Sequence, residues 1–221
     1  MKKMVQAGFV LGMIFLYVTT SGQSIESGSE RVKNKITQKT TLDILINGVG
    51  TNLNYGKSNS GLADYKKPAL GIQAGLSLQV GFSSDFSIVS ELYFMMRGGK
   101  LKANNPLTNT ESTLRFYSVE LPVLARFHFG KFHLNAGPSL AYNFDGTRKI
   151  EDMTSDLTFK NSVGGFKRFD AGIQMGGGYS FRVSQKIVTV DLRYCYGMTN
   201  ISYDKEVYNR NMLISLHFSK A

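Results

Sequence analysis

Apolar side chains alternate with small or polar ones at a period of two from residue 41 to the C-terminus. This is the period of a β-strand whose two faces meet different surroundings. Eight segments show the pattern: 42–55, 70–80, 85–97, 115–129, 131–144, 169–181, 188–197 and 211–218. They are roughly 10–15 residues long, enough to cross a bilayer at a tilt, whereas strands of soluble proteins average about 5–6. The first segment keeps its alternation only through a phase slip near Gly48–Gly50, where we expect a β-bulge.

The connections between these segments alternate strictly in length. Short turns are expected at 83–85, 130–131 and 184–185, and long polar links at 56–67, 98–112, 145–165 and 200–209. Outer-membrane barrels combine short periplasmic turns with long extracellular loops in this way. The sequence therefore predicts an all-β fold, an eight-stranded antiparallel up-and-down transmembrane β-barrel with both ends in the periplasm.

The two faces of the strands predict which side meets lipid. One face is apolar and carries aromatic residues near the strand ends, where we expect them to form girdles: Phe82, Phe129, Tyr142, Phe144 and Phe181. The other face is rich in glycine and serine and carries the charges: Glu91, Glu120, Arg126, Asp170, Asp191 and Arg193. Eight strands leave an interior that side chains can fill. We expect these six residues to form an ion-pair network that plugs the lumen, because buried charges must pair. The alternative is a charge relay or a gated ion path.

The N-terminus predicts export. Residues 1–22 have a positive start, an apolar stretch over 5–18 and small residues at 19–22, which is the pattern of a cleaved signal peptide. Residues 23–40 are polar without a period and are expected to be a flexible periplasmic tail, so the barrel would span 41–221. The predicted location is the outer membrane.

Export restricts the partners that the net charge suggests. The formal charge of +10 falls to +8 when Lys2 and Lys3 are removed with the signal peptide. An exported chain is not expected to bind nucleic acid, so lipid phosphate or an anionic surface polysaccharide is the better counter-charge. Cys195 is the single cysteine, which rules out an internal disulfide.

Other candidate sites are less well supported. His128, His133 and His217 fall at the periplasmic end, but the last strand lies across the barrel from the first two, so no metal site and no cofactor is predicted. The long links offer nucleophiles and carboxylates but no histidine to act as a base: Ser60, Asp64, Glu111, Glu151, Asp152 and Asp156. We therefore expect no enzymatic activity, although a mechanism that uses carboxylates alone stays open.

Several short motifs resemble one family. They are Ser90-Glu91-Leu92-Tyr93, Val119-Glu120-Leu121-Pro122-Val123-Leu124, Ala136-Gly137-Pro138, Asp191-Leu192-Arg193-Tyr194 and Gly197-Met198-Thr199-Asn200. Their order and spacing over residues 41–221 are similar to those of the PorT-type outer-membrane β-barrel family of Bacteroidetes. The resemblance implies an eight-stranded barrel in the outer membrane, and its namesake takes part in type IX secretion.

The resulting hypothesis is a non-enzymatic outer-membrane barrel that contacts lipid and other envelope or secretion proteins. Its specific version is an accessory of type IX-like protein secretion. Two alternatives remain: a structural or adhesive envelope barrel with no secretion role, and a lipid-modifying outer-membrane enzyme.

Overall fold

The computed structural model describes residues 40–220, with side chains up to residue 217. The predicted signal peptide and the predicted tail up to residue 39 lie outside the described residues, and Thr40 begins the first strand. Eight long strands form the body of the molecule: β1 (Thr40–Tyr55), β3 (Ala69–Gly81), β4 (Phe86–Leu101), β5 (Ser112–Phe129), β6 (Phe132–Ile150), β8 (Phe169–Val183), β9 (Lys186–Gly197) and β10 (Val207–Lys220).

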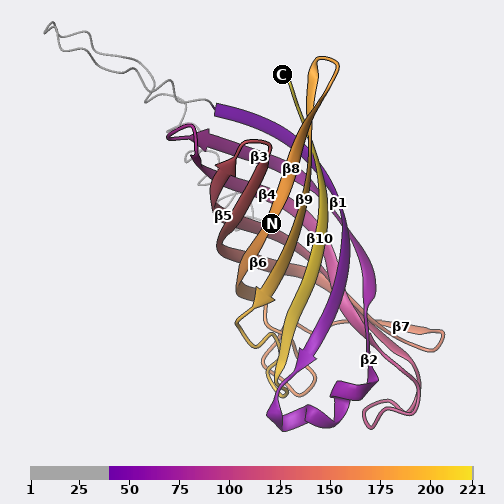
Figure 1. The fold of residues 1–221 in the computed structure, drawn as a ribbon. Helices are drawn as coiled ribbons and strands as arrows, with labels where there is room; N and C mark the ends of the chain where they lie inside the picture. The colour runs from indigo at the N-terminus through magenta and orange to yellow at the C-terminus, as the bar shows by residue number, and fades with distance from the viewer. Residues whose placement is uncertain (1–39, 221) are drawn as a thin grey trace, which may run out of the picture. The chain divides into compact units, whose positions relative to one another are not determined.

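These strands form a closed ring (Figure 1). Each pairs antiparallel with its neighbour in sequence, β10 pairs with β1, and the β4–β5 pairing completes the circuit. The predicted all-β barrel of eight strands is therefore confirmed. Two short strands lie outside the ring: β2 (Lys66–Lys67) pairs only with β4, and β7 (Met153–Asp156) only with β6. No helix within residues 40–220 is long and apolar enough to span a membrane.

The two ends of the barrel differ as the link lengths predicted. The β3–β4, β5–β6 and β8–β9 connections are tight turns, and two of them use left-handed backbone at Gly130 (φ 66°) and Ser184 (φ 55°). The four long connections gather at the other end, together with β2, β7 and the 3₁₀ segment η1 (Lys57–Tyr65) (Figure 1). We call these the turn end and the loop end.

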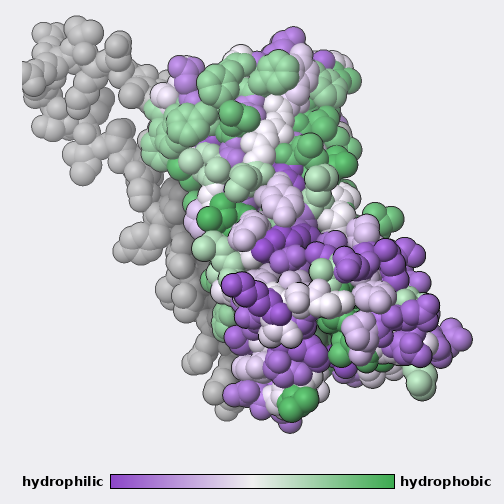
Figure 2. All heavy atoms as spheres, turned by 60° about the horizontal axis from the view of Figure 1, so that its bottom comes forward, coloured by the Kyte–Doolittle hydropathy of each residue, from purple (hydrophilic) through white to green (hydrophobic). Residues whose placement is uncertain are grey.

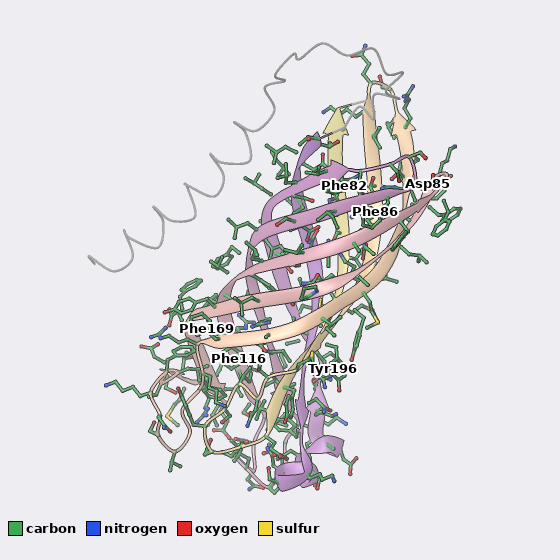
Figure 3. The ribbon with its side chains drawn as sticks, turned by 90° about the vertical axis from the view of Figure 1, so that its left-hand side faces the viewer. Phe82, Asp85, Phe86, Phe116, Phe169 and Tyr196 are labelled. Carbon is green, nitrogen blue, oxygen red and sulfur yellow. The ribbon has the colours of Figure 1, made fainter. Side chains whose placement is uncertain are left out.

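On the face that Figure 2 shows, the outer surface is apolar toward the turn end and hydrophilic at the loop end. The five predicted girdle residues are all exposed. Phe82, Phe129 and Phe181 lie at the turn end, where ring pairs such as Phe132–Tyr179 (4.7 Å between centroids) line the surface. Tyr142 and Phe144 lie further toward the loops and contact Phe169 (5.2 Å) and Phe94 (5.7 Å). Figure 3 shows Phe82 and Phe86 near one end and Phe169 and Tyr196 further along the barrel.

The distance between these two aromatic bands is close to the thickness of the hydrocarbon layer of a membrane. We call the apolar surface between them the belt. On β6, Phe132 and Tyr142 are ten residues apart. A tilted strand rising ~3.4 Å per residue covers about 25 Å along the barrel axis over that length, which matches the apolar band of outer-membrane barrels.

The predicted bulge in the first strand is wrong. β1 pairs in unbroken register with both β3 and β10 from Ile44 to Thr51, and Gly48 stays on the outer face. Val49 and Leu53 point inward because the lumen has apolar layers toward the loop end, so no phase slip is needed to bury them. The register shift occurs instead between Tyr117 and Ser118 of β5, opposite Phe144 of β6.

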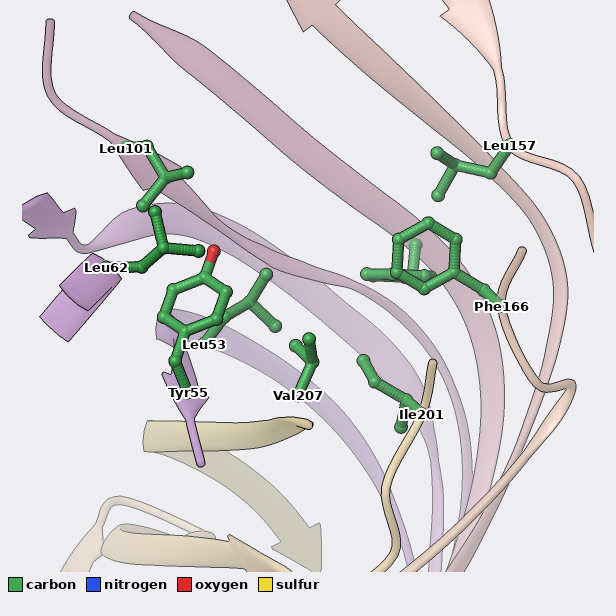
Figure 4. Packing of buried hydrophobic residues seen from close by; sticks show 9 residues of the cluster. Leu53, Tyr55, Leu62, Leu101, Leu157, Phe166, Ile201 and Val207 are labelled. Carbon is green, nitrogen blue, oxygen red and sulfur yellow. The ribbon is translucent and has the colours of Figure 1, made fainter. Parts of the chain in front are cut away.

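The strands also run further into the predicted links than expected. β4 continues to Leu101, and β6 continues to Ile150 before it turns back into β7. The reason is an apolar core that fills the barrel at the loop end (Figure 4), where barrel residues pack against loop residues: Leu53, Tyr55, Leu62, Leu101, Phe116, Leu157, Phe166, Ile201 and Val207. Strands that extend past the belt bury one face against this core, which stabilises them outside the bilayer.

Candidate functional site in the barrel lumen

One ion pair spans the lumen from wall to wall. Arg193 of β9 donates from Nη1 to Glu91 Oε2 (2.8 Å) and from Nη2 to Glu91 Oε1 (2.9 Å). In the ring order, β4 and β9 are separated by three strands on either side, so they face each other across the barrel. Both side chains are fully buried. A bidentate guanidinium–carboxylate pair is among the stronger polar contacts in proteins, and here it ties opposite walls together.

A second cluster centres on Asp191 of β9, which lies two residues from Arg193 toward the turn end. Its Oδ2 accepts from Arg126 Nη2 (3.1 Å), from Asn135 Nδ2 (3.0 Å) and lies 3.0 Å from His133 Nε2. Arg193 Nε lies 3.5 Å from Asp191 Oδ1. This contact joins the Glu91–Arg193 pair and the Asp191 cluster into one network. Glycines make this crowding possible, because a Cβ at Gly176 would lie 2.7 Å from Arg193 Cγ and one at Gly178 would lie 2.5 Å from His133 Cε1.

A third cluster lies nearer the loop end. Arg97 of β4 places Nη2 3.0 Å from Asp170 of β8 and Nη1 3.7 Å from Glu120 of β5. Asp170 also accepts from Asn209 Nδ2 (2.7 Å) and from Thr199 Oγ1 (2.6 Å). These contacts join four strands on different sides of the lumen.

Gln174 of β8 connects the third cluster to the Glu91–Arg193 pair. Its Nε2 donates to Glu120 Oε1 (2.9 Å), and its Oε1 accepts from Arg193 Nη1 (3.2 Å). Nε2 also lies 2.6 Å from the hydroxyl of Tyr93. The three clusters and Gln174 thus form one connected set of contacts through the middle of the barrel.

All six charged residues that the alternation placed inside lie in this set and are buried. The predicted network lacked Arg97, although Arg97 shares the inward face of its strand with Glu91 at a spacing of six residues. It also left out Gln174 and gave His133 no partner. Charge on the inward face was the signal for Arg97, but nothing in the sequence marks a neutral Gln174 as a bridging residue.

Apolar residues occupy part of the same interior. Leu45, Val49, Met95, Leu213 and Cys195 pack with Tyr93 in a small buried cluster. Cys195 is 5% exposed and is a packed side chain in this cluster. These side chains lie in the central lumen beside the ionic contacts.

The turn end of the lumen is open and polar. A cavity of about 770 Å³ lies there, and its lining includes Asp43, Arg126, His128, His133 and His217. His128 Nε2 lies 2.8 Å from Ser87 Oγ, and its ring centroid is 6.2 Å from that of His133, which is engaged by Asp191. Within residues 40–217, no group of three or more His, Cys, Asp or Glu side chains is arranged to hold a metal ion.

The polar loop residues considered for catalysis lie on separate elements. Ser60 and Asp64 belong to η1, Glu151 and Asp152 form the β6–β7 turn, and Asp156 ends β7. All of them are exposed or half-buried on the loop surface. Glu111 lies 4.0 Å from the ammonium groups of Lys67 and Lys100.

A closed barrel with an apolar belt outside and paired charges inside defines an integral membrane β-barrel, because lipid can satisfy neither open strand edges nor exposed charges. The family model described as outer membrane protein beta-barrel domain matches residues 38–203. The chain belongs to this family, and its location is the outer membrane. The loop end is therefore extracellular and the turn end periplasmic.

Several solved structures are similar to this chain at low identity and low TM-score. Neisserial surface protein A has 13% identity over 82% of this chain and 98% of its own, with a TM-score of 0.48. The attachment invasion locus protein Ail of Yersinia pestis has 10% identity over 82% and 99%, with a TM-score of 0.43. The outer membrane protein W of E. coli has 11% identity over 81% and 97%, with a TM-score of 0.37. Comparison with curated proteins gives no significant match.

Because the belt lies in lipid, introducing a charged side chain there should lower the free energy of unfolding more than introducing one in a loop. Val123 faces outward near the middle of β5, between the two aromatic bands. Val123→Arg is expected to lower the free energy of unfolding by about 2–4 kcal/mol, the cost of an arginine near the bilayer midplane. Val163→Arg, at a loop position that is 93% exposed, should change it by less than ~0.5 kcal/mol. Denaturant unfolding in lipid vesicles measures both, and equal effects would contradict the assignment.

Proposed function

We propose that this protein is a non-enzymatic outer-membrane barrel with a closed lumen, whose extracellular end is a rigid platform for other envelope proteins. The observation that carries the proposal is the Glu91–Arg193 pair, which joins opposite walls at the centre of the lumen. The connected polar set around it and the apolar core beyond it occupy the central and loop-end parts of the lumen. Such a barrel suits anchoring and binding better than passage of solutes.

The rigidity of the platform is supported by contacts among all four long connections. Gly56 N donates to Glu206 O (2.9 Å), and Lys102 N donates to Tyr65 O (2.8 Å). Gly164 N donates to Asp204 Oδ2 (3.0 Å), and Glu151 N to Glu111 O (3.4 Å). Each connection is thereby bonded to two others above the apolar core. A preorganised surface loses less conformational entropy on binding a partner.

A hollow on this platform favours a protein as the binding partner. It has a volume of about 670 Å³ and lies on the outer face of β4, β5, β6 and β7, with lining residues that include Lys100, Glu111, Arg115, Tyr117, Lys149 and Asp152. Both signs of charge and one tyrosine occur together, a composition suited to a polar protein interface. The scattered positions of Ser60, Asp64 and Glu151 on the loop surface favour this role over that of a lipid-modifying enzyme.

The specific version of the proposal is an accessory role in type IX-like secretion. It is supported by the motifs around Glu91, Glu120 and Arg193, which resemble the PorT-type family of Bacteroidetes. It also assumes export through cleavage of residues 1–22 and a barrel domain over 41–221. Deletion of the gene should then retain C-terminally tagged exoproteins inside the cell, and a plasmid copy should restore their secretion. Unchanged secretion with reduced surface adhesion would favour the adhesive envelope barrel instead.

The closed lumen gives an expected electrical result. In planar bilayers the wild-type barrel should show no stable conductance, because side chains fill its centre. Glu91→Ala combined with Arg193→Ala removes the pair that spans the lumen and should produce small, frequent openings. Asp64→Ala combined with Lys102→Ala, a pair of positions on the loop surface, should stay silent. Steady channels in the wild-type protein would overturn the closed-lumen proposal.

A further inference from the structure

Two arginines lie at the outer edge of the lipid-facing belt and are held in place by carbonyl groups. Arg168, just before β8, donates from Nη1 to the backbone oxygens of Asn143 (3.2 Å) and Phe144 (2.9 Å). Arg210 of β10 donates from Nη1 to the backbone oxygens of Gly197 (2.6 Å) and Asn209 (2.8 Å). Each guanidinium is fixed through one nitrogen, and its Nη2 and Nε make no hydrogen bond among the described residues.

Both guanidinium groups also lie over aromatic rings. Arg210 is 3.7 Å from the ring centroid of Tyr196, and Arg168 is 4.7 Å from that of Phe159 and 5.8 Å from that of Tyr142. Stacking on a ring restricts a guanidinium to one plane and keeps its edge available for hydrogen bonds. The two sites thus have the same design, although they lie on different strands.

Neither arginine has an acidic partner within the part of the chain that the structure describes. Among the side chains of residues 40–217, no carboxylate oxygen lies within 4.0 Å of either guanidinium. Three basic residues nearer the tip differ, since Lys67 and Lys100 contact Glu111 and Lys205 contacts Asp204. A preorganised guanidinium that is half-buried and without a counter-charge is suited to bind an anion.

The position of the two arginines identifies the anion. Tyr142, Phe169 and Tyr196 are exposed aromatic residues at the extracellular edge of the belt, and Figure 3 shows Phe169 and Tyr196 at a similar level along the barrel. Aromatic residues at this edge mark the level of the lipid headgroups. The charged groups that meet the protein there are the phosphates of outer-leaflet lipids, and a planar guanidinium can bind a phosphate through two hydrogen bonds.

We propose that Arg168 and Arg210 are two binding sites for the phosphate groups of phosphorylated lipids in the outer leaflet. The lipid chains would lie along the apolar belt below each site, beside Phe169 and Tyr196, while the phosphate accepts from Nη2 and Nε above. Two sites on different sides of the β8–β9 pair fix the depth and the tilt of the barrel in the leaflet. This proposal concerns the membrane contact and does not rest on the proposed protein platform.

The test measures lipid retention by the purified full-length mature barrel in native mass spectrometry. Diphosphorylated lipid A is the probe, and fully dephosphorylated lipid A is the matched control lipid. The wild-type protein should retain the phosphorylated form about tenfold more strongly. Equal retention of both lipids would overturn the proposal without the need for any variant.

Variants then locate the sites. R168Q combined with R210Q should lower the affinity for phosphorylated lipid A about tenfold, to the level of the dephosphorylated lipid. K57Q combined with K160Q removes the same charge from exposed loop positions and should change the affinity less than about twofold. R168K combined with R210K keeps the charge but loses the planar fork and should show an intermediate loss. Equal losses in the two glutamine variants would show a general charge effect and overturn the two-site proposal.

Discussion

Gly75→Val is expected to abolish formation of the folded barrel. Gly75 lies on the inward face of β3, and a Cβ there would meet the backbone oxygen of Leu92 at 2.2 Å and Tyr93 Cα at 2.5 Å. These are backbone atoms of the paired strand β4, so no side-chain rotation can relieve the contact. Overpacking of this kind should cost at least about 3 kcal/mol and displace the strand pairing.

The matched control for this substitution is on the neighbouring strand. Gly48 of β1 lies on the lipid-facing side, and no heavy atom lies within 4 Å of the place that a Cβ would take, so Gly48→Val should fold normally. Refolding into detergent micelles, followed by migration on a gel with and without heating, reports the folded fraction of each variant. A folded fraction for Gly75→Val equal to that of Gly48→Val would show that β3 and β4 can separate locally without loss of the barrel.

Glu91→Ala is expected to lower the free energy of unfolding by roughly 3–5 kcal/mol. The substitution leaves the guanidinium of Arg193 buried without its bidentate partner, and an uncompensated buried charge is strongly destabilising. Asp191 at 3.5 Å from Nε offers only partial compensation, because its other oxygen is already engaged by Arg126 and His133. The cost should therefore exceed that of removing a loop carboxylate such as Asp64, which should be near zero.

A double substitution separates the loss of a contact from the cost of a stranded charge. Glu91→Leu combined with Arg193→Met removes both charges and keeps apolar volume in the lumen, so it should be more stable than Glu91→Ala alone. Far-UV circular dichroism during denaturant unfolding in lipid vesicles measures all three proteins, since the chain contains no tryptophan for fluorescence. Equal stability of the single and double variants would contradict a role for the unpaired guanidinium.

The layers of the interior explain why these two substitutions should matter more than changes on the surface. The apolar core at the extracellular end, the central ionic set and the open periplasmic cavity of about 770 Å³ follow one another along the axis. Of these three layers, the periplasmic cavity is the one that is open to solvent. Glu91 lies in the middle layer, where its side chain and that of Arg193 are fully buried, so the loss of one charge leaves the other away from solvent.

Alternation along the strands was sufficient to predict the fold and six charged residues of the lumen. A period of two has only two faces, so an apolar face on strands long enough to span a bilayer already fixes what points outward. Glu91, Asp191 and Arg193 were assigned to the interior on that basis alone. The alternation of short and long links, from Gly130 to the connection after Gly197, also fixed which end carries the loops.

The pairing of these residues could not be predicted in the same way. Alternation places Glu91 inside but does not say which of the interior cations it meets, and that depends on the ring order that sets β4 opposite β9. Arg97 and Gln174 gain their roles from the same arrangement. The supposed bulge at Gly48 failed for a related reason, because the sequence does not show that the extracellular part of the lumen is apolar.

The sequence by itself thus determined the class of the protein, the order of its long strands and the side of the wall on which most strand residues outside β1 lie, because these follow from local periodicity. Only the tertiary structure decided the partners across the lumen, the apolar core under the loops and the aromatic support of Arg168 and Arg210. Those contacts join residues that are far apart along the chain, and closure of the ring is the step that brings them within a few ångströms of one another.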